Sequence, residues 1–74
     1  MEEKILKILA EVNEEILDYD GDNLIDAGLL DSFQIIDLVE MFEEEFDVEI
    51  DAELVVVENF RTKEAIIDML EDIL

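Results

Sequence analysis

Residues 32–46 read SFQIIDLVEMFEEEF, and their hydrophobic pattern decides the fold. Apolar side chains recur three or four residues apart, which is the spacing of one face of an α-helix. That face comprises Ile35, Leu38, Val39, Phe42 and Phe46. Acidic side chains fall largely on the opposite face, namely Asp37, Glu40, Glu43 and Glu44. The segment is therefore predicted to form an amphipathic helix from Ser32 to Phe46.

Two further segments have the same periodicity. The first is predicted to be a helix from Glu2 to Leu17, with an apolar stripe formed by Ile5, Leu9, Val12 and Ile16. It should end before DYDGDN at residues 18–23, which has turn chemistry. The second is TKEAIIDMLEDIL at residues 62–74, where Thr62 is a suitable N-cap. Its apolar stripe is Ile66, Met69, Leu70 and Ile73.

The segment DAELVVVENF at residues 51–60 is the ambiguous one. Its three consecutive valines are β-branched and favour a strand. A lone strand has no pairing partner, however, because no other segment has strand character, so we expect a short helical turn. The predicted fold is all-α: a small four-helix bundle of three main helices and one short helix, with a long loop after the first helix. We expect residues 1–74 to form a single domain.

Charge restricts the function more than any other property of the composition. The chain has 24 acidic and 4 basic residues, a net charge of −20, and no cation between residues 8 and 60. Nucleic-acid phosphates and anionic membranes both require a basic face, so neither is an expected partner. Protein partners should instead carry basic patches. Disorder is not expected despite the acidity, because 51% of the residues are hydrophobic and they are periodic.

Several residue types are absent from the chain. It has no cysteine and no histidine, so neither a disulfide framework nor a zinc cluster is expected. Without these residues, or a suitably placed lysine, there is no nucleophile–base pair, and we expect no enzymatic activity. The N-terminal segment lacks the continuous apolar run of a signal peptide, and no stretch has the length of a membrane span. The expected state is a cytoplasmic monomer.

An acidic loop, DYDGDNLID at residues 18–26, resembles part of a calcium-binding loop. Asp18, Asp20, Asp22 and Asp26 occupy positions 1, 3, 5 and 9 of the EF-hand pattern. Asn23 stands at position 6, where it would tolerate the left-handed backbone that glycine usually supplies. Leu29 occupies position 12, where a bidentate glutamate is required, so we predict no metal site. A calcium-responsive or acidic protein-interaction module using this loop stays open as the alternative function.

The candidate site lies in AGLLDSFQ, residues 27–34. Asp31 as N-cap with Gln34 three residues later resembles a capping box, and Ser32 is the only serine in the chain. A serine at a helix start is often only structural. Phe33 and Ile36, however, lie off the core stripe of the helix. Apolar residues rimmed by acidic ones favour a docking surface, although packing against the long loop would explain them equally well.

These residues carry a family resemblance. GLLDSF at residues 28–33, followed by LVEMFEEEFDVEI at residues 38–50, resembles the acyl carrier protein and peptidyl carrier family. The family's motif is Asp-Ser and a large apolar residue at the start of the second helix, matched here by Asp31, Ser32 and Phe33. The likeness covers nearly the whole chain.

The resemblance implies a function. Ser32 would receive 4′-phosphopantetheine from coenzyme A through a phosphopantetheinyl transferase, with Asp31 beside the attachment. An acyl or aminoacyl group would then be carried as a thioester, supplied by a loading ligase and passed to downstream acyl-processing enzymes. The resemblance also implies recognition of basic docking patches by the second helix. The expected partner-binding residues are Phe33, Ile36, Asp37, Glu43 and Glu44.

The cargo is less defined. The order Gly28-Leu29-Leu30 before Asp31 departs from fatty-acid carriers and is more similar to D-alanyl carrier proteins of teichoic-acid modification and to stand-alone carriers. A fatty acyl chain, an amino acid and a polyketide unit all remain open. Phe42 and Phe46 would fill the interior of the bundle, which favours a short or amino-acid cargo.

Overall fold

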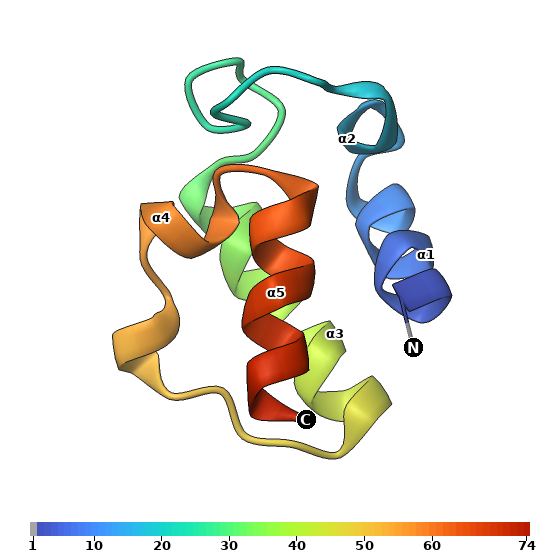
Figure 1. The fold of residues 1–74 in the computed structure, drawn as a ribbon, viewed down its shortest axis with the longest axis vertical. Helices are drawn as coiled ribbons and strands as arrows, with labels where there is room; N and C mark the ends of the chain where they lie inside the picture. Colours follow the sequence, from blue (N-terminus) through green and yellow to red (C-terminus); the bar gives the residue numbers. More distant parts are fainter. Residues whose placement is uncertain (1) are drawn as a thin grey trace.

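The computed structural model describes residues 2–74, and these residues form a helical protein without β-strands (Figure 1). The three longer helices are α1 (Glu2–Val12), α3 (Ser32–Phe46) and α5 (Lys63–Ile73). The short ones are α2 (Glu15–Asp18), the 3-10 turn η1 (Ala52–Leu54) and α4 (Val57–Phe60). The all-α prediction is confirmed, as are the bounds of α3 and the long loop that precedes it.

The core forms where α1 packs against both α3 and α5. Ile5 and Leu9 of α1 are fully buried, together with Leu38 and Phe42 of α3. From α5 and the preceding segment, the core receives Phe60, Ile66 and Leu70. Among residues 2–74 no polar or charged side chain is buried, so the acidic residues all lie at or near the surface. No helix in this part of the chain combines the length and the apolar character needed to cross a membrane.

The first predicted helix is wrong at its C-terminal end. Instead of running from Glu2 to Leu17, it ends at Val12, and a separate short helix begins at Glu15. Asn13 causes the break: its side-chain Oδ1 accepts a hydrogen bond from the Glu15 amide at 3.0 Å, and its Nδ2 donates to the Leu29 carbonyl oxygen at 3.2 Å. An asparagine that bonds the local backbone competes with the helical ladder. The apolar stripe survives the break, since Ile16 is still fully buried.

The long loop is anchored to the start of α5. Leu24 is buried, and its amide donates to the Arg61 carbonyl oxygen at 2.6 Å. The Arg61 Nε donates to the Asp22 carbonyl oxygen at 2.9 Å, and the Lys63 ammonium donates to the Leu17 carbonyl oxygen. Two of the chain's four cations thus hold backbone carbonyls of this loop region, which fixes its course toward α3.

The valine-containing segment differs in detail from the prediction. One short helical turn was expected there, whereas η1 and α4 are two separate turns joined at Val55 and Val56. Asn59 holds them together, because its Nδ2 donates to the Leu54 carbonyl oxygen at 2.8 Å. The predicted cap of the last helix is confirmed, since the Thr62 hydroxyl oxygen accepts from the Ala65 amide at 3.0 Å.

Candidate functional site

A complete capping box starts helix α3. Asp31 has an extended backbone, and its Oδ1 accepts from the Gln34 amide at 2.8 Å. The Gln34 Oε1 in turn accepts from the Asp31 amide at 3.0 Å. Both bonds match the capping-box pattern, in which two otherwise unpaired amides are satisfied reciprocally. Because Asp31 is the cap, Ser32 is the first residue of the helix, and its exposed side chain is not the capping group.

The electrostatics at this helix start are unusual for so acidic a chain. The first turn of α3 contains no acidic residue, whereas every other helix within residues 2–74 has one in its first turn. The unpaired amides and the dipole at a helix N-terminus favour a negative group. The carboxylate of Asp31 is engaged by the Gln34 amide. Apart from the Asp31 cap, the first turn of α3 therefore places no acidic side chain beside Ser32.

An apolar groove opens beside Ser32. Its volume is about 310 Å³, and its lining comes from α3 and from the segment that leads into α4. Apart from Ser32, every lining residue is a branched aliphatic one: Ile35, Ile36, Val55, Val56 and Val57. The sequence analysis did not include the three valines in this site, because it predicted only a short helical turn for their segment. Their presence could have been predicted, since a short connecting segment cannot bury three consecutive valines and must leave an apolar surface.

The predicted apolar docking residues are exposed. The Phe33 side chain is 78% exposed and that of Ile36 is 53% exposed, so the helical phase of α3 was correctly assigned. Val56 and Val57 extend this exposed apolar surface, with 45% and 52% exposure. The packing alternative for Phe33 and Ile36 is therefore wrong. A role of these two side chains in partner binding stays a prediction.

The three acidic residues predicted to bind partners occupy different environments. Asp37 and Glu44 are exposed on α3. Glu43 is half-buried, and its Oε2 accepts from the Ile50 amide at 2.8 Å. Glu43 therefore holds the segment that follows α3, a contact between residues seven apart that the helical pattern could not predict.

The acidic loop does not gather its carboxylates. Within residues 2–74 no group of three or more acidic residues is placed to hold a metal ion. The loop is organised by Tyr19 and Asn23 instead: the Tyr19 hydroxyl donates to the Asn23 carbonyl oxygen and accepts from the Asn23 amide, both at 3.0 Å. Asn23 does not adopt the left-handed backbone that glycine has at position 6 of a calcium loop, and the non-glycine residue with positive φ among residues 2–74 is Asp47. The geometry gives no support to the calcium alternative.

Comparison with known proteins identifies the family. The family model described as phosphopantetheine attachment site matches residues 3–70, nearly the whole chain. No curated protein and no solved structure matches. The carrier resemblance is thereby confirmed at the level of the family, while the likeness to D-alanyl carriers stays a prediction. The chain belongs to the phosphopantetheine attachment-site family of acyl and peptidyl carriers, which is defined by a covalently attached 4′-phosphopantetheine.

Proposed function

We propose that this protein is a carrier whose phosphopantetheine is attached to Ser32, and that it has no catalytic activity of its own. One observation carries the assignment of the residue: Ser32 is exposed at the one described helix start without an acidic first turn, and it adjoins an apolar groove. Since it is the only serine in the chain, no second serine competes for the attachment.

The chain's own residues have distinct parts in this proposal. The Ser32 oxygen forms a bond to the phosphorus of the phosphopantetheine unit of coenzyme A, the adenosine bisphosphate leaves, and a base of the transferase takes the hydroxyl proton. The amides of the first turn of α3 then stabilise the charge of the phosphodiester. Asp31 fixes the helix start through its bond to the Gln34 amide. The side chains of Ile36 and Val57 would hold apolar parts of the arm.

The bound group supplies the thiol on which the cargo is carried as a thioester, since the chain has no cysteine. For the cargo we propose a short acyl or aminoacyl group. Phe42 is fully buried and its ring stacks on that of Phe46, with centroids 6.4 Å apart, so aromatic rings fill the interior next to α3. A long-chain acyl group loaded onto the carrier should leave the NMR shifts of Phe42 and Leu38 unchanged. Large shifts at both would contradict a short cargo.

The attachment is tested by intact mass. The protein is incubated with coenzyme A, Mg²⁺ and a broad-specificity phosphopantetheinyl transferase, and it should gain the mass of one phosphopantetheine. Ser32→Ala should gain nothing while keeping the same helical circular dichroism spectrum. Ser32→Thr is a matched control that keeps a hydroxyl but adds a methyl group, and it should be modified more slowly. Modification of Ser32→Ala, or no modification by several transferases, would overturn the proposal.

Partner enzymes are expected to combine a basic patch with a shallow apolar pocket. Phe33 and Ile36 would enter the pocket, and Asp37 and Glu44 would pair with the basic residues. Exposed charges mainly change the association rate and its dependence on salt. For modification by the transferase, Asp37→Asn and Glu44→Gln should therefore raise the KM, more at low salt than at high salt, whereas Phe33→Ala should raise it at both. Glu43 also belongs to the proposed surface, although its carboxylate is already engaged with Ile50.

A further inference from the structure

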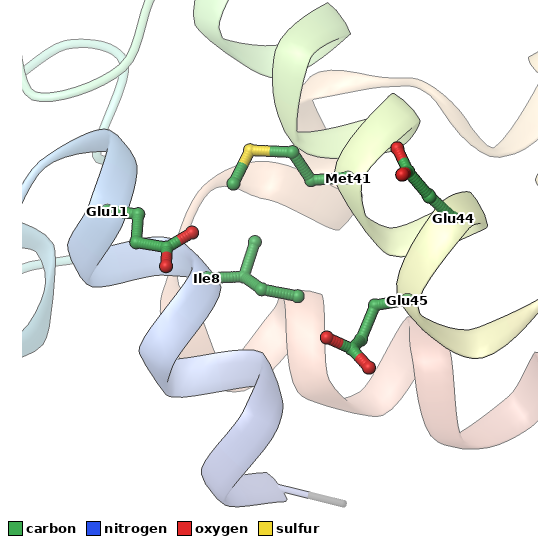
Figure 2. Close-up of a pocket in the computed structure, with 5 residues that line it drawn as sticks. All are labelled: Ile8, Glu11, Met41, Glu44 and Glu45. Atoms are coloured by element: carbon green, nitrogen blue, oxygen red, sulfur yellow. The ribbon is translucent and has the colours of Figure 1, made fainter.

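A second groove lies between α1 and α3, away from Ser32. It consists of two hollows of about 350 and 410 Å³, which adjoin because Glu11 and Met41 line both. Its floor is apolar: Ile8 and Val12 come from α1, and Met41 comes from α3. Figure 2 shows Ile8 and Met41 reaching toward each other across the space between the two helices. Met41 is only half-buried, which leaves its flexible thioether side chain free to adapt to a ligand.

The rim of this groove is acidic on both sides. The rim residues are Glu11 of α1 and Asp37, Glu40, Glu44 and Glu45 of α3. The Glu45 side chain points from α3 toward α1 (Figure 2). The residues that line the two hollows include no cation, so like charges face each other across an apolar floor. A ligand that brings positive charges to both rims and an apolar stripe to the floor would relieve this repulsion.

The groove comes nearest to the attachment site at Gln34, which lines one of its hollows and also bonds to Asp31, but its centre lies on another side of α3. Ser32 and Met41 are nine residues apart on α3, and at about 100° per residue they lie on nearly opposite sides of the helix. The groove at Ser32 faces α4, whereas Met41 faces α1. A partner bound between α1 and α3 would therefore leave the hydroxyl of Ser32 accessible.

We propose that the α1/α3 groove docks a basic amphipathic helix of a partner protein, and that this contact holds the carrier while Ser32 stays free. The occupant follows from charge and shape. A furrow between two helices accepts a third helix, whose apolar residues at positions i, i+3 or i+4, and i+7 meet the floor while Lys or Arg residues meet the rims. A second copy of this chain does not fit, because each copy carries a net charge of −20. The proposal goes beyond the carrier function and does not require modification of Ser32.

The test uses the unmodified protein and a synthetic helical peptide of about 18 residues with one Leu stripe flanked by Lys and Arg. Binding is measured by fluorescence anisotropy and mapped by NMR on the ¹⁵N-labelled protein. The amide shifts should cluster at Ile8, Val12 and Met41. A peptide of the same composition with a scrambled stripe should bind at least about fivefold more weakly. Shifts centred on Phe33 and Ile36, or no binding by the amphipathic peptide, would overturn the proposal.

Matched variants distinguish docking in the groove from attraction of the basic peptide to the overall negative charge of the protein. The pair Glu11→Gln and Glu45→Gln removes two charges from the rims, and Asp68→Asn with Glu71→Gln removes two exposed charges from α5. The first pair should weaken binding about fivefold and the second by less than about twofold. Equal losses would show that only the overall charge attracts the peptide. Met41→Ala should weaken peptide binding without changing its salt dependence. An unchanged affinity would contradict the proposed contribution of the apolar floor to binding.

Simultaneous occupation is measured last. Because the transferase and the peptide both use Asp37 and Glu44, the peptide should raise the KM for modification of Ser32, but only to a plateau once the groove is saturated, since Ser32 itself stays accessible. A KM that rises in proportion to the peptide concentration would show that the two ligands exclude each other and would overturn the proposal that Ser32 stays free. If Ser32 is not modified even without the peptide, the carrier proposal fails while the peptide-binding result stands by itself.

Discussion

Asp31 combines two properties in one side chain, a negative charge and a helix cap. Its Oδ1 accepts from the Gln34 amide, and this bond needs an acceptor but no charge. We expect Asp31→Ala to lower the free energy of unfolding by about 1 kcal/mol, because the Gln34 amide loses its partner. Asp31→Asn should keep most of the stability, since asparagine caps as well as aspartate does. Urea unfolding measures both.

The same two variants separate stability from modification. If Asp31→Asn is stable yet slowly modified at Ser32, the charge itself contributes to the transferase reaction. If Asp31→Asn is as unstable as Asp31→Ala, the side-chain bond to Gln34 is not what stabilises the helix start.

Gly21 is required by the conformation of the loop rather than by its own backbone angles. A Cβ atom at this position would overlap the Tyr19 hydroxyl oxygen, so Gly21→Ala must displace the tyrosine ring. The displaced hydroxyl would lose both of its hydrogen bonds with Asn23. We expect a loss of about 1–2 kcal/mol in the free energy of unfolding.

A double-mutant cycle with Tyr19→Phe tests this cause. Tyr19→Phe already removes the two hydrogen bonds, so the two substitutions together should cost less than the sum of their separate effects. Additive losses would show that Gly21→Ala acts by a route that does not involve the Tyr19 hydroxyl.

At the scale of single residues, the sequence predicts whatever depends on neighbours along one helix. The cap by Asp31 and the exposure of Phe33 and Ile36 follow from the spacing within a few residues. The bond from the Ile50 amide to Glu43 does not, because it depends on how the chain turns after α3. The hydrogen bonds between Tyr19 and Asn23 were not predicted either. The aspartates of that loop have the spacing of calcium ligands, and this pattern gives no information about a contact between the tyrosine hydroxyl and the backbone.

Asn13 decides how the first helical segment is divided. In a continuous helix from Glu2 to Leu17, alanine at position 13 would stabilise the protein, because alanine has the higher helix propensity. In the observed structure, the Asn13 side chain bonds to the Glu15 amide and the Leu29 carbonyl oxygen. We therefore expect Asn13→Ala to lower the free energy of unfolding by about 1 kcal/mol.

Asn13→Asp is the matched control for that measurement. It keeps an acceptor for the Glu15 amide but has no donor for the Leu29 carbonyl oxygen, so its loss should be smaller or similar. A gain of stability and of helical circular dichroism in Asn13→Ala would contradict the break between α1 and α2.

Glu43 connects α3 to the segment that follows it. Glu43→Ala should lower the free energy of unfolding by about 1–2 kcal/mol, since the Ile50 amide is left without its acceptor in a partly buried place. Glu43→Gln retains a side-chain oxygen and should cost less. Glu44→Ala, one residue further along and exposed, should change stability little. Equal effects of Glu43→Ala and Glu44→Ala in thermal unfolding would contradict the structural role.

The helices whose patterns were strongest were predicted best. The Ser32–Phe46 helix has the predicted bounds, and the last helix has its predicted Thr62 cap. Helix propensity and apolar spacing could not locate the break at Asn13, because the decisive hydrogen bond reaches Leu29 in a distant loop. The valine-containing segment was predicted less well because its conformation depends on distant contacts: its valines line a groove with α3, and Phe60 is fully buried in the core.

Electrostatic repulsion acts over the whole molecule. Its net charge is −20, and its Cα extents are only 29 × 24 × 20 Å. At 10 mM salt the screening length is about 30 Å, so nearly all the charges repel one another, whereas at 150 mM it is about 8 Å. We expect the Tm to rise by about 5 °C or more between these conditions.

Sodium and potassium chloride should act alike in that experiment, and divalent cations should act at lower concentration. A Tm that does not change with salt would mean that the acidic residues are spread far enough apart to cost little. An effect of calcium that magnesium cannot reproduce would instead indicate a specific site and would revive the calcium alternative.

The C-terminus lies at the far end of α5 from its junction with α4 (Figure 1). Since Ser32 shares a groove with Val57 of α4, about 16 Å of helix α5 separates the two regions along the molecule. A biotin tag added after Leu74 would therefore immobilise the protein with Ser32 and its groove directed away from a biosensor chip. Binding kinetics recorded in that orientation would be free of steric interference from the support.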